Sequence, residues 1–264
     1  MKRKCIAITF VIMLFLFVFM QIWKLFNGAN DSVQDTIDGH EYVDMGLSVK
    51  WATMNLGASS IYEEGQLYAW GETKGYGEPI VDYAKDWKGK KNENYVSQKI
   101  KKSFTWNAYK WVYKYDNRMK CKLSKYCDYD RYGKLDSIIT LLPEDDAANV
   151  NWGGGWRMPT KEEFEELIEH SEFDWVENYN GSSQSGWLVY SDVTGKTLFF
   201  PVNKKVTCDS LSWGDNVSWI WLSTVSGYDA YSGCFCNVSD EQLPLRLFTA
   251  TERCRGLAIR PVHQ

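Results

Sequence analysis

Residues 155–170 read GWRMPTKEEFEELIEH, and this stretch decides most of what can be said about the fold. It predicts a helix over residues 161–170, because Thr160 stands at the N-cap and Glu163, three residues later, completes a capping box. Phe164, Leu167 and Ile168 follow at helical spacing and form one apolar stripe, with glutamates on the solvated face. We therefore expect a capped, amphipathic helix that packs its apolar side beneath strands.

The residues just before this helix shape the backbone and cover the helix, and they do not form a catalytic motif. Pro159 forces the preceding residue into an extended conformation, and Trp156 is placed to cover the base of the helix. The three glycines at 153–155 predict a turn with close backbone approach, not a phosphate-binding loop.

On either side of residues 155–170, the spacing of apolar and turn-forming residues predicts one more helix and many short strands. A short helix is expected at 143–149, where a proline and acidic residues begin the segment. Residues 72–135 show no sustained period and predict a long irregular insertion. Strands are expected at 42–44, 47–54, 67–70, 186–190, 197–201, 219–224, 231–238 and 256–262. This order favours an α+β fold over a doubly wound sheet.

Charge excludes one class of partner. The chain of 264 residues has a net charge of −4 and a pI near 5.5, so it lacks the basic face that nucleic acid requires. Basic residues gather at 85–102 and 110–125, but acidic residues flank them, and we interpret both runs as solvated loop faces.

Aromatic residues make up 16% of the chain, including 13 Trp and 16 Tyr. Large aromatic side chains either fill the space between irregular segments or form an exposed contact surface. For the second alternative, the aromatic residues of the late loops and strands are the predicted contacts: Trp213, Trp219, Trp221, Tyr228 and Tyr231.

The N-terminus predicts export. A basic start is followed by residues 5–20 without a charge, which as a helix span roughly 24 Å. Basic residues before this run and acidic ones after it place the start inside and the bulk of the chain outside. We expect a signal peptide or signal anchor over 1–26, a linker over 27–40 and one domain over 41–264. The length of the apolar run and its bulky end favour the anchor.

Six cysteines follow the leader, an even number that suits disulfides in an exported domain, although sequence cannot choose among 15 connectivities. They are Cys121, Cys127, Cys208, Cys234, Cys236 and Cys254. A zinc site is disfavoured, because no closely spaced pair of the usual kind is present and the three histidines are far apart in sequence.

Residues 128–136 resemble part of a calcium-binding loop. Asp128, Asp130 and Asp136 stand at positions one, three and nine, with Gly133 at position six. Ile139 stands where a bidentate glutamate is expected, so the loop is incomplete. The alternative is a turn rich in aspartate, and calcium is the one cofactor that the sequence suggests.

Several stretches together resemble the Bacteroidetes and Fibrobacter "major paralogous domain" family, and the helix start resembles formylglycine-generating-enzyme-like domains. The stretches are VDMGLSVKWATMNLGA (43–58), YAWGET (68–73), PEDDAA (143–148), NWGGGWRMPT (151–160), WLST (221–224) and RGLAIRPV (255–262). The resemblance implies a C-type-lectin-like domain with short antiparallel strands, one or two helices, paired termini and long loops that carry any binding site.

The enzymatic branch of that resemblance oxidises a substrate cysteine with copper and a cysteine pair near the C-terminus. Here Cys234, Cys236 and Cys254 lie in the corresponding region, and Arg253 and Arg255 flank Cys254, but the family's spacing and its Gly-Gly-Ser-Trp type of run are missing. We therefore expect a non-catalytic cell-envelope module that contacts a polysaccharide or a protein, anchored in the membrane or secreted. A copper-dependent oxidase and a structural envelope or adhesion component are the alternatives.

Overall fold

The computed structural model describes residues 35–85, 91–100, 104–115, 121–207, 210–213, 217–226, 232–239 and 248–264. Residues from Thr36 to Gln264 form one compact unit. The predicted leader, residues 1–26, lies outside the described residues. Within the described residues, no helix combines the length and the apolar character that a membrane crossing requires.

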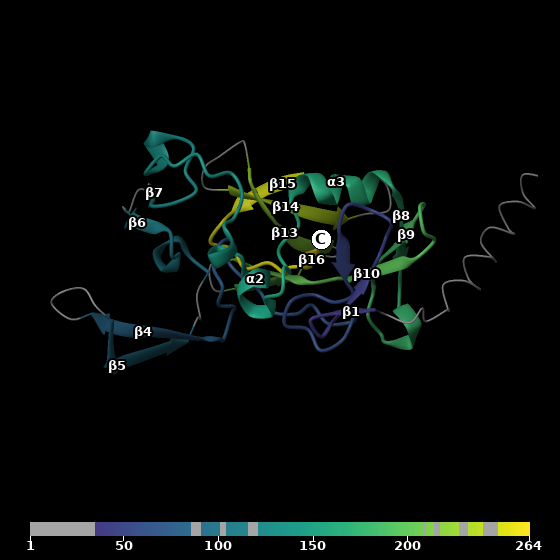
Figure 1. Cartoon of the computed structure of the whole chain (residues 1–264), viewed down its shortest axis with the longest axis horizontal. Helices are drawn as coiled ribbons and strands as arrows, with labels where there is room; N and C mark the ends of the chain where they lie inside the picture. The colour runs from purple at the N-terminus through teal and green to yellow at the C-terminus, as the bar shows by residue number, and fades with distance from the viewer. Residues whose placement is uncertain are drawn as a thin grey trace, which may run out of the picture. The chain divides into compact units, whose positions relative to one another are not determined.

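The unit is a mixed α+β structure, with two α-helices and several small antiparallel sheets among the described residues (Figure 1). The helices are α2 (Ala147–Trp152) and α3 (Lys161–Glu169), and four 3-10 turns are η1 (Trp106–Ala108), η2 (Asp130–Tyr132), η3 (Pro143–Asp145) and η4 (Tyr179–Gly181). The strands are β1 (Thr36–Ile37), β2 (His40–Val43), β3 (Lys50–Ala52), β4 (Pro79–Lys85), β5 (Lys91–Ile100), β6 (Val112–Tyr115), β7 (Cys121–Leu123), β8 (Ser171–Val176), β9 (Gly186–Ser191), β10 (Thr197–Pro201), β11 (Lys204–Thr207), β12 (Ser210–Trp213), β13 (Val217–Val225), β14 (Ser232–Ser239), β15 (Phe248–Glu252) and β16 (Val262–His263).

The two ends of the unit meet in one sheet. Its strand order is β1-β2-β3-β16, so the last strand of the chain pairs with β3, with Val262 opposite Trp51. Two three-stranded sheets follow, β10-β9-β8 and β13-β14-β15. Helix α3 packs against β13, β14 and β8 (Figure 1).

The predicted helix α3 is confirmed, including its cap. The hydroxyl of Thr160 accepts a hydrogen bond from the Glu163 N–H at 3.2 Å, and a Glu163 carboxylate oxygen accepts one from the Thr160 N–H at 2.9 Å. Phe164 and Leu167 are fully buried, and Ile168 is partly buried against the same core. Glu163 also forms a two-point ion pair with Arg157, which holds the extended segment against the first turn.

The extended segment 156–160 joins elements from distant parts of the chain. Arg157 exchanges two backbone hydrogen bonds with Val262, and the Trp156 indole donates to the Ile37 carbonyl at 3.2 Å. The predicted helix at 143–149 is divided at Asp146, which ends η3 and caps α2. Burial raises the pKa of Asp146 to about 6, although the N–H groups of Ala148, Asn149 and Met158 oppose that shift.

Other element predictions need correction. Residues 67–70 form no strand, and only Tyr68 makes a bridge, to Leu257. The predicted strand at 256–262 is reduced to its end. Before β16 begins, Leu257 and Ala258 make only isolated bridges, to Tyr68 and to Ile220 of β13. The insertion at 72–135 is not wholly irregular, since it contains the β4–β5 and β6–β7 hairpins.

Much of the aromatic excess fills the core. Among the described residues, Trp51, Trp70, Trp156 and Trp221 are completely buried. Trp51 belongs to one core cluster, Trp70 and Trp221 belong to a second, and Trp156 packs against the rings of His40, Trp152 and His263. The space-filling interpretation of the aromatic content therefore applies to these tryptophans.

Candidate functional site

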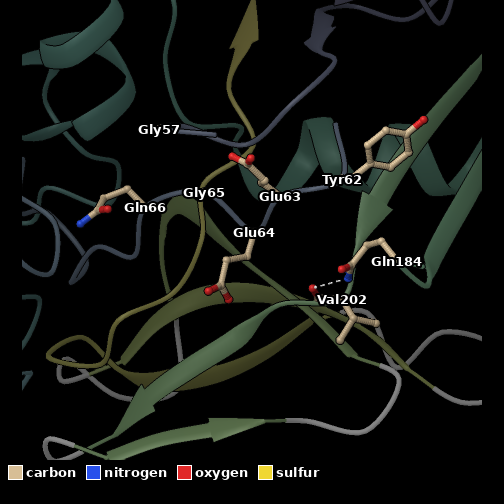
Figure 2. A pocket seen from close by; sticks show the side chains of 8 residues that line it. All are labelled: Gly57, Tyr62, Glu63, Glu64, Gly65, Gln66, Gln184 and Val202. Atoms are coloured by element: carbon tan, nitrogen blue, oxygen red, sulfur yellow. Dashed lines mark hydrogen bonds between the residues drawn. The ribbon is translucent and has the colours of Figure 1, made fainter. Parts of the chain in front are cut away.

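A pocket of about 370 Å³ lies beside the loop that joins Leu56 to Leu67. Figure 2 shows its lining, which comes from this loop, from the segment before β9 and from the end of the β10 segment. The lining residues are Gly57, Tyr62, Glu63, Glu64, Gly65, Gln66, Gln184 and Val202. A concave site with one aromatic ring and several polar groups suits a small polar ligand.

Backbone hydrogen bonds close the loop at its base. The Gln66 N–H donates to the Leu56 carbonyl at 2.8 Å, and the Leu56 N–H donates to Ile259 at 2.8 Å. Gly57 and Gly65 both have positive φ, at 78° and 75°, and flank the loop. A Cβ at Gly65 would lie 2.6 Å from the Leu56 carbonyl oxygen, so this closure requires glycine.

A buried arginine positions the same loop from below. Arg260 is fully buried, and its Nε donates to the Asn55 side-chain oxygen at 2.8 Å. The Asn55 amide in turn donates to the Glu64 carbonyl at 2.9 Å. Its Nη1 donates to the carbonyls of Ala52 and Thr53, and its Nη2 donates to that of Phe199. Burial lowers the pKa of Arg260 to about 9.

Tyr62 forms the aromatic wall of the pocket. Its ring lies 6.5 Å from Phe199 and 6.2 Å from Tyr179, and these two rings stack on each other at 4.3 Å. Tyr62 therefore contacts two further rings, while its own side chain stays partly exposed. Such a ring offers a flat apolar face at little entropic cost.

Polar groups complete the lining. One Glu63 oxygen accepts the Ser59 N–H at 2.8 Å, which orients that carboxylate. The Gln184 amide nitrogen donates to the carbonyls of Ser185 and Val202, both at 3.3 Å, and Figure 2 shows the second bond. The Gln66 amide nitrogen donates to the Tyr76 carbonyl.

The predicted aromatic contacts do not meet at this pocket. Trp221 is completely buried, and its indole donates to the Tyr68 carbonyl at 2.8 Å, so it belongs to the core and cannot contact a partner. Trp219 is half-buried against the second core cluster. Trp213 ends β12, but its side chain lies outside the described ones, and Tyr228 and Tyr231 lie outside the described residues.

The three aspartates of the calcium-like loop have different environments. Asp136 accepts the N–H groups of Tyr126, Cys127 and Ile138, so it acts as a backbone cap. Asp130 is exposed in the first position of η2, and Asp128 is half-buried. Over the described ranges, no group of three or more acidic, histidine or cysteine side chains is arranged to hold a metal ion.

Two of the six cysteines have described side chains, and both are buried. The thiol of Cys127 lies 3.0 Å from the Tyr129 carbonyl, and burial raises its pKa, whereas a nucleophilic thiol requires a lowered one. Cys254 is 3% exposed in the same core cluster. The side chains of Cys121, Cys234 and Cys236 lie outside the described side chains, and Cys208 lies outside the described residues.

The basic run at 110–125 is partly structural rather than a solvated face. Lys110 and Lys125 bond to the buried Asp145 carboxylate at 2.9 Å and 2.6 Å, and the Tyr126 hydroxyl donates to it at 2.7 Å. Burial alone would raise the pKa of Asp145, but the hydrogen bonds from Lys125, Tyr126 and Lys110 lower it. Both lysines therefore pair with a buried carboxylate, although Lys110 itself is exposed.

Sequence reasoning missed the pocket residues. The one signal is in segment 57–66, where two glycines enclose a polar run with a tyrosine and two glutamates, which is typical of a binding loop. Gln184 and Val202 gave no signal, because only the fold brings them to this loop.

Comparison of the chain with protein-family models, with curated proteins and with solved structures gives no match in any of the three.

Proposed function

We propose that this chain is a non-catalytic binding module of the cell envelope, and that the pocket beside residues 57–66 binds a saccharide. The C-type-lectin-like fold and membership of the major paralogous domain family belong to this proposal, since both rest on the sequence stretches quoted above. Export and membrane attachment likewise rest on the apolar run in residues 5–20.

One observation carries the proposal: a tyrosine and four polar residues line one hollow of about 370 Å³. A sugar ring presents an apolar C–H face and a rim of hydroxyl groups. Tyr62 offers a surface for the face, and Glu63, Glu64, Gln66 and Gln184 offer hydrogen-bonding groups for the rim.

The proposal is tested on a glycan array with the purified full-length chain, compared with Tyr62→Ala and with Tyr113→Ala as a matched control. Tyr113 is 52% exposed and does not line the pocket. We expect Tyr62→Ala to weaken binding about tenfold, which corresponds to about 1.4 kcal/mol, because an aromatic anchor is lost. Tyr113→Ala should bind as the wild type does.

Two results would contradict the proposal. The first is that no saccharide on the array binds the wild-type chain. The second is that Tyr62→Ala and Tyr113→Ala affect saccharide binding equally while both variants keep the melting temperature of the wild type.

A further inference from the structure

A patch of exposed tyrosine and basic side chains lies around β7. Tyr113 of β6 is 52% exposed, and Tyr129, just before η2, is 51% exposed. Arg131 in η2 and Lys134 just after it are also exposed, and Tyr132 of η2 is half-buried. We call these five residues the tyrosine–cation patch.

Strand β7 brings the two parts of the patch together. Leu123 of β7 pairs with Val112 of β6 and also forms a bridge to Gly133 (Figure 1). The Lys134 N–H donates to the Leu123 carbonyl at 2.9 Å. A Cβ at Gly133 would lie 2.1 Å from the Leu123 carbonyl oxygen, so this close approach requires glycine. Backbone contacts therefore hold β6 and the segment after η2 on the same strand.

Both cations of the patch lie over tyrosine rings. The Arg131 guanidinium carbon is 4.4 Å from the centre of the Tyr132 ring and 5.6 Å from that of Tyr129. The Lys134 Nζ is 5.5 Å from the centre of the Tyr113 ring. Among the described residues, neither cation forms a salt bridge with a carboxylate. A contact with a ring face orients the cation. The planar fork of Arg131 N–H groups therefore remains available to a carboxylate.

The charge around the patch differs in sign from that of the chain as a whole. Residues 110–136 contain eight lysines and arginines and four aspartates, whereas the complete chain has 30 basic and 34 acidic residues. Lys110 and Lys125 pair with the buried Asp145, and the remaining basic residues still outnumber the aspartates of this segment. The segment therefore complements a negatively charged partner.

Two features favour a protein partner over an anionic membrane. Tyrosine and arginine are among the residue types that most often dominate the binding energy of protein interfaces. The exposed Asp130 directly precedes Arg131, so a surface that is negative throughout would be repelled at this point. A single acidic segment can instead direct its carboxylates to Arg131 and Lys134 and keep them away from Asp130.

We propose that the tyrosine–cation patch binds an acidic segment of a partner protein. Carboxylates of that segment pair with Arg131 and Lys134, and apolar side chains between them lie against the exposed rings of Tyr113 and Tyr129. This proposal does not rest on saccharide binding, because it uses none of the residues 57–66.

The test is fluorescence anisotropy of the full-length chain with a labelled peptide of four Glu-Glu-Leu repeats. The same peptide with glutamine in place of every glutamate is the neutral control. We expect the acidic peptide to bind about tenfold more tightly than the neutral one. Arg131→Gln should weaken binding of the acidic peptide about tenfold. Arg131→Lys keeps the charge but loses the planar fork, and it should weaken binding about threefold.

Matched variants separate the patch from net charge and from a general loss of structure. Lys196→Gln removes one positive charge from the exposed turn before β10 and should leave the affinity for the peptide unchanged. Tyr113→Ala should weaken binding of the acidic peptide about fivefold and keep saccharide binding, whereas Tyr62→Ala should do the reverse. This reversal distinguishes failure of the patch proposal from failure of the proposed function.

Three results would overturn the proposal. The first is equal affinity for the acidic and the neutral peptide. The second is an equal loss in Lys196→Gln and Arg131→Gln, which would indicate attraction by net charge alone. The third is that Arg131→Gln weakens binding to vesicles of phosphatidylcholine and phosphatidylglycerol but not to the acidic peptide, which would indicate a membrane surface.

Discussion

Replacing Arg260 with methionine should destabilise the whole unit and disturb the pocket together. The guanidinium makes four hydrogen bonds of 2.8–3.1 Å, to Asn55, Ala52, Thr53 and Phe199. Hydrogen bonds to a charged group contribute about 1.5–3 kcal/mol each, so the four contribute about 6–12 kcal/mol before the cost of burial.

Burial of the charge offsets part of this gain. The pKa of Arg260 falls to about 9 because the guanidinium is desolvated, which corresponds to a cost of about 5 kcal/mol. The difference leaves a net loss of about 1–7 kcal/mol for Arg260→Met, with a central value of about 4 kcal/mol. Methionine fills much of the volume but leaves the acceptors unsatisfied.

The assay is urea denaturation of the full-length chain and of both variants Arg260→Met and Arg131→Met. Arg131 is exposed in η2, so its variant controls for the loss of one positive charge. We expect a loss of about 4 kcal/mol for Arg260→Met and less than about 0.5 kcal/mol for Arg131→Met. A loss below about 1 kcal/mol for Arg260→Met would refute the reasoning that this side chain supports the loop through Asn55.

Three further predictions follow from the described contacts. Thr160→Ala removes the N-cap of α3 and should lower the free energy of unfolding by about 1 kcal/mol in denaturant titration. Thr160→Ser keeps a capping hydroxyl and should lower it less. Equal losses in the two variants would contradict the capping role. Asp136→Ala leaves three backbone N–H groups without their acceptor and should lower the free energy of unfolding by about 2 kcal/mol or more. The melting temperature of the wild type should not respond to calcium or to its chelation. A shift of that temperature on adding calcium would support the calcium site instead of the capping role. The folded chain binds a proton at Asp146 more tightly than the unfolded chain does, so this group contributes stability that is present near pH 4 and lost as the pH rises through about 6. The stability of wild type relative to Asp146→Asn should therefore fall by about 2.4 kcal/mol between pH 4 and pH 7, and a rise would contradict the assigned burial.

Short sequence patterns were enough to predict those elements whose bounds depend on neighbouring residues. Helix α3 follows from its capping box and apolar stripe, and β10 follows from a short apolar run whose predicted bounds agree with the structure. Strand β8 was missed because its residues alternate with acidic ones directly after the helix, so the segment has no apolar run of its own.

The burial of Trp221 shows where local reasoning fails. The aromatic excess and the lack of a catalytic set suggest Trp221 as a surface contact. Strand β13 is instead covered on both faces, with burial at nearly every position. Which face is covered depends on partners elsewhere in the chain, and this information is absent from the strand itself.

The pocket could not be predicted for a similar reason. Its support runs from Arg260 to Asn55, which are 205 residues apart in the chain, and then to the Glu64 carbonyl. The loop 57–66 was visible as a polar, glycine-flanked segment, but its concavity requires Gln184 and Val202 to lie opposite. Contacts of this separation are set by the fold and not by any short pattern.

The central claim is that a saccharide occupies the hollow lined by residues of the 57–66 loop. Hydrogen–deuterium exchange of the full-length chain, saturated with the saccharide that it binds most tightly on the glycan array, tests this claim most directly. The account predicts slower exchange of backbone amides within residues 57–66 and around Gln184, with no change in β6 or η2. Protection elsewhere, with exchange in 57–66 unaltered, would contradict it.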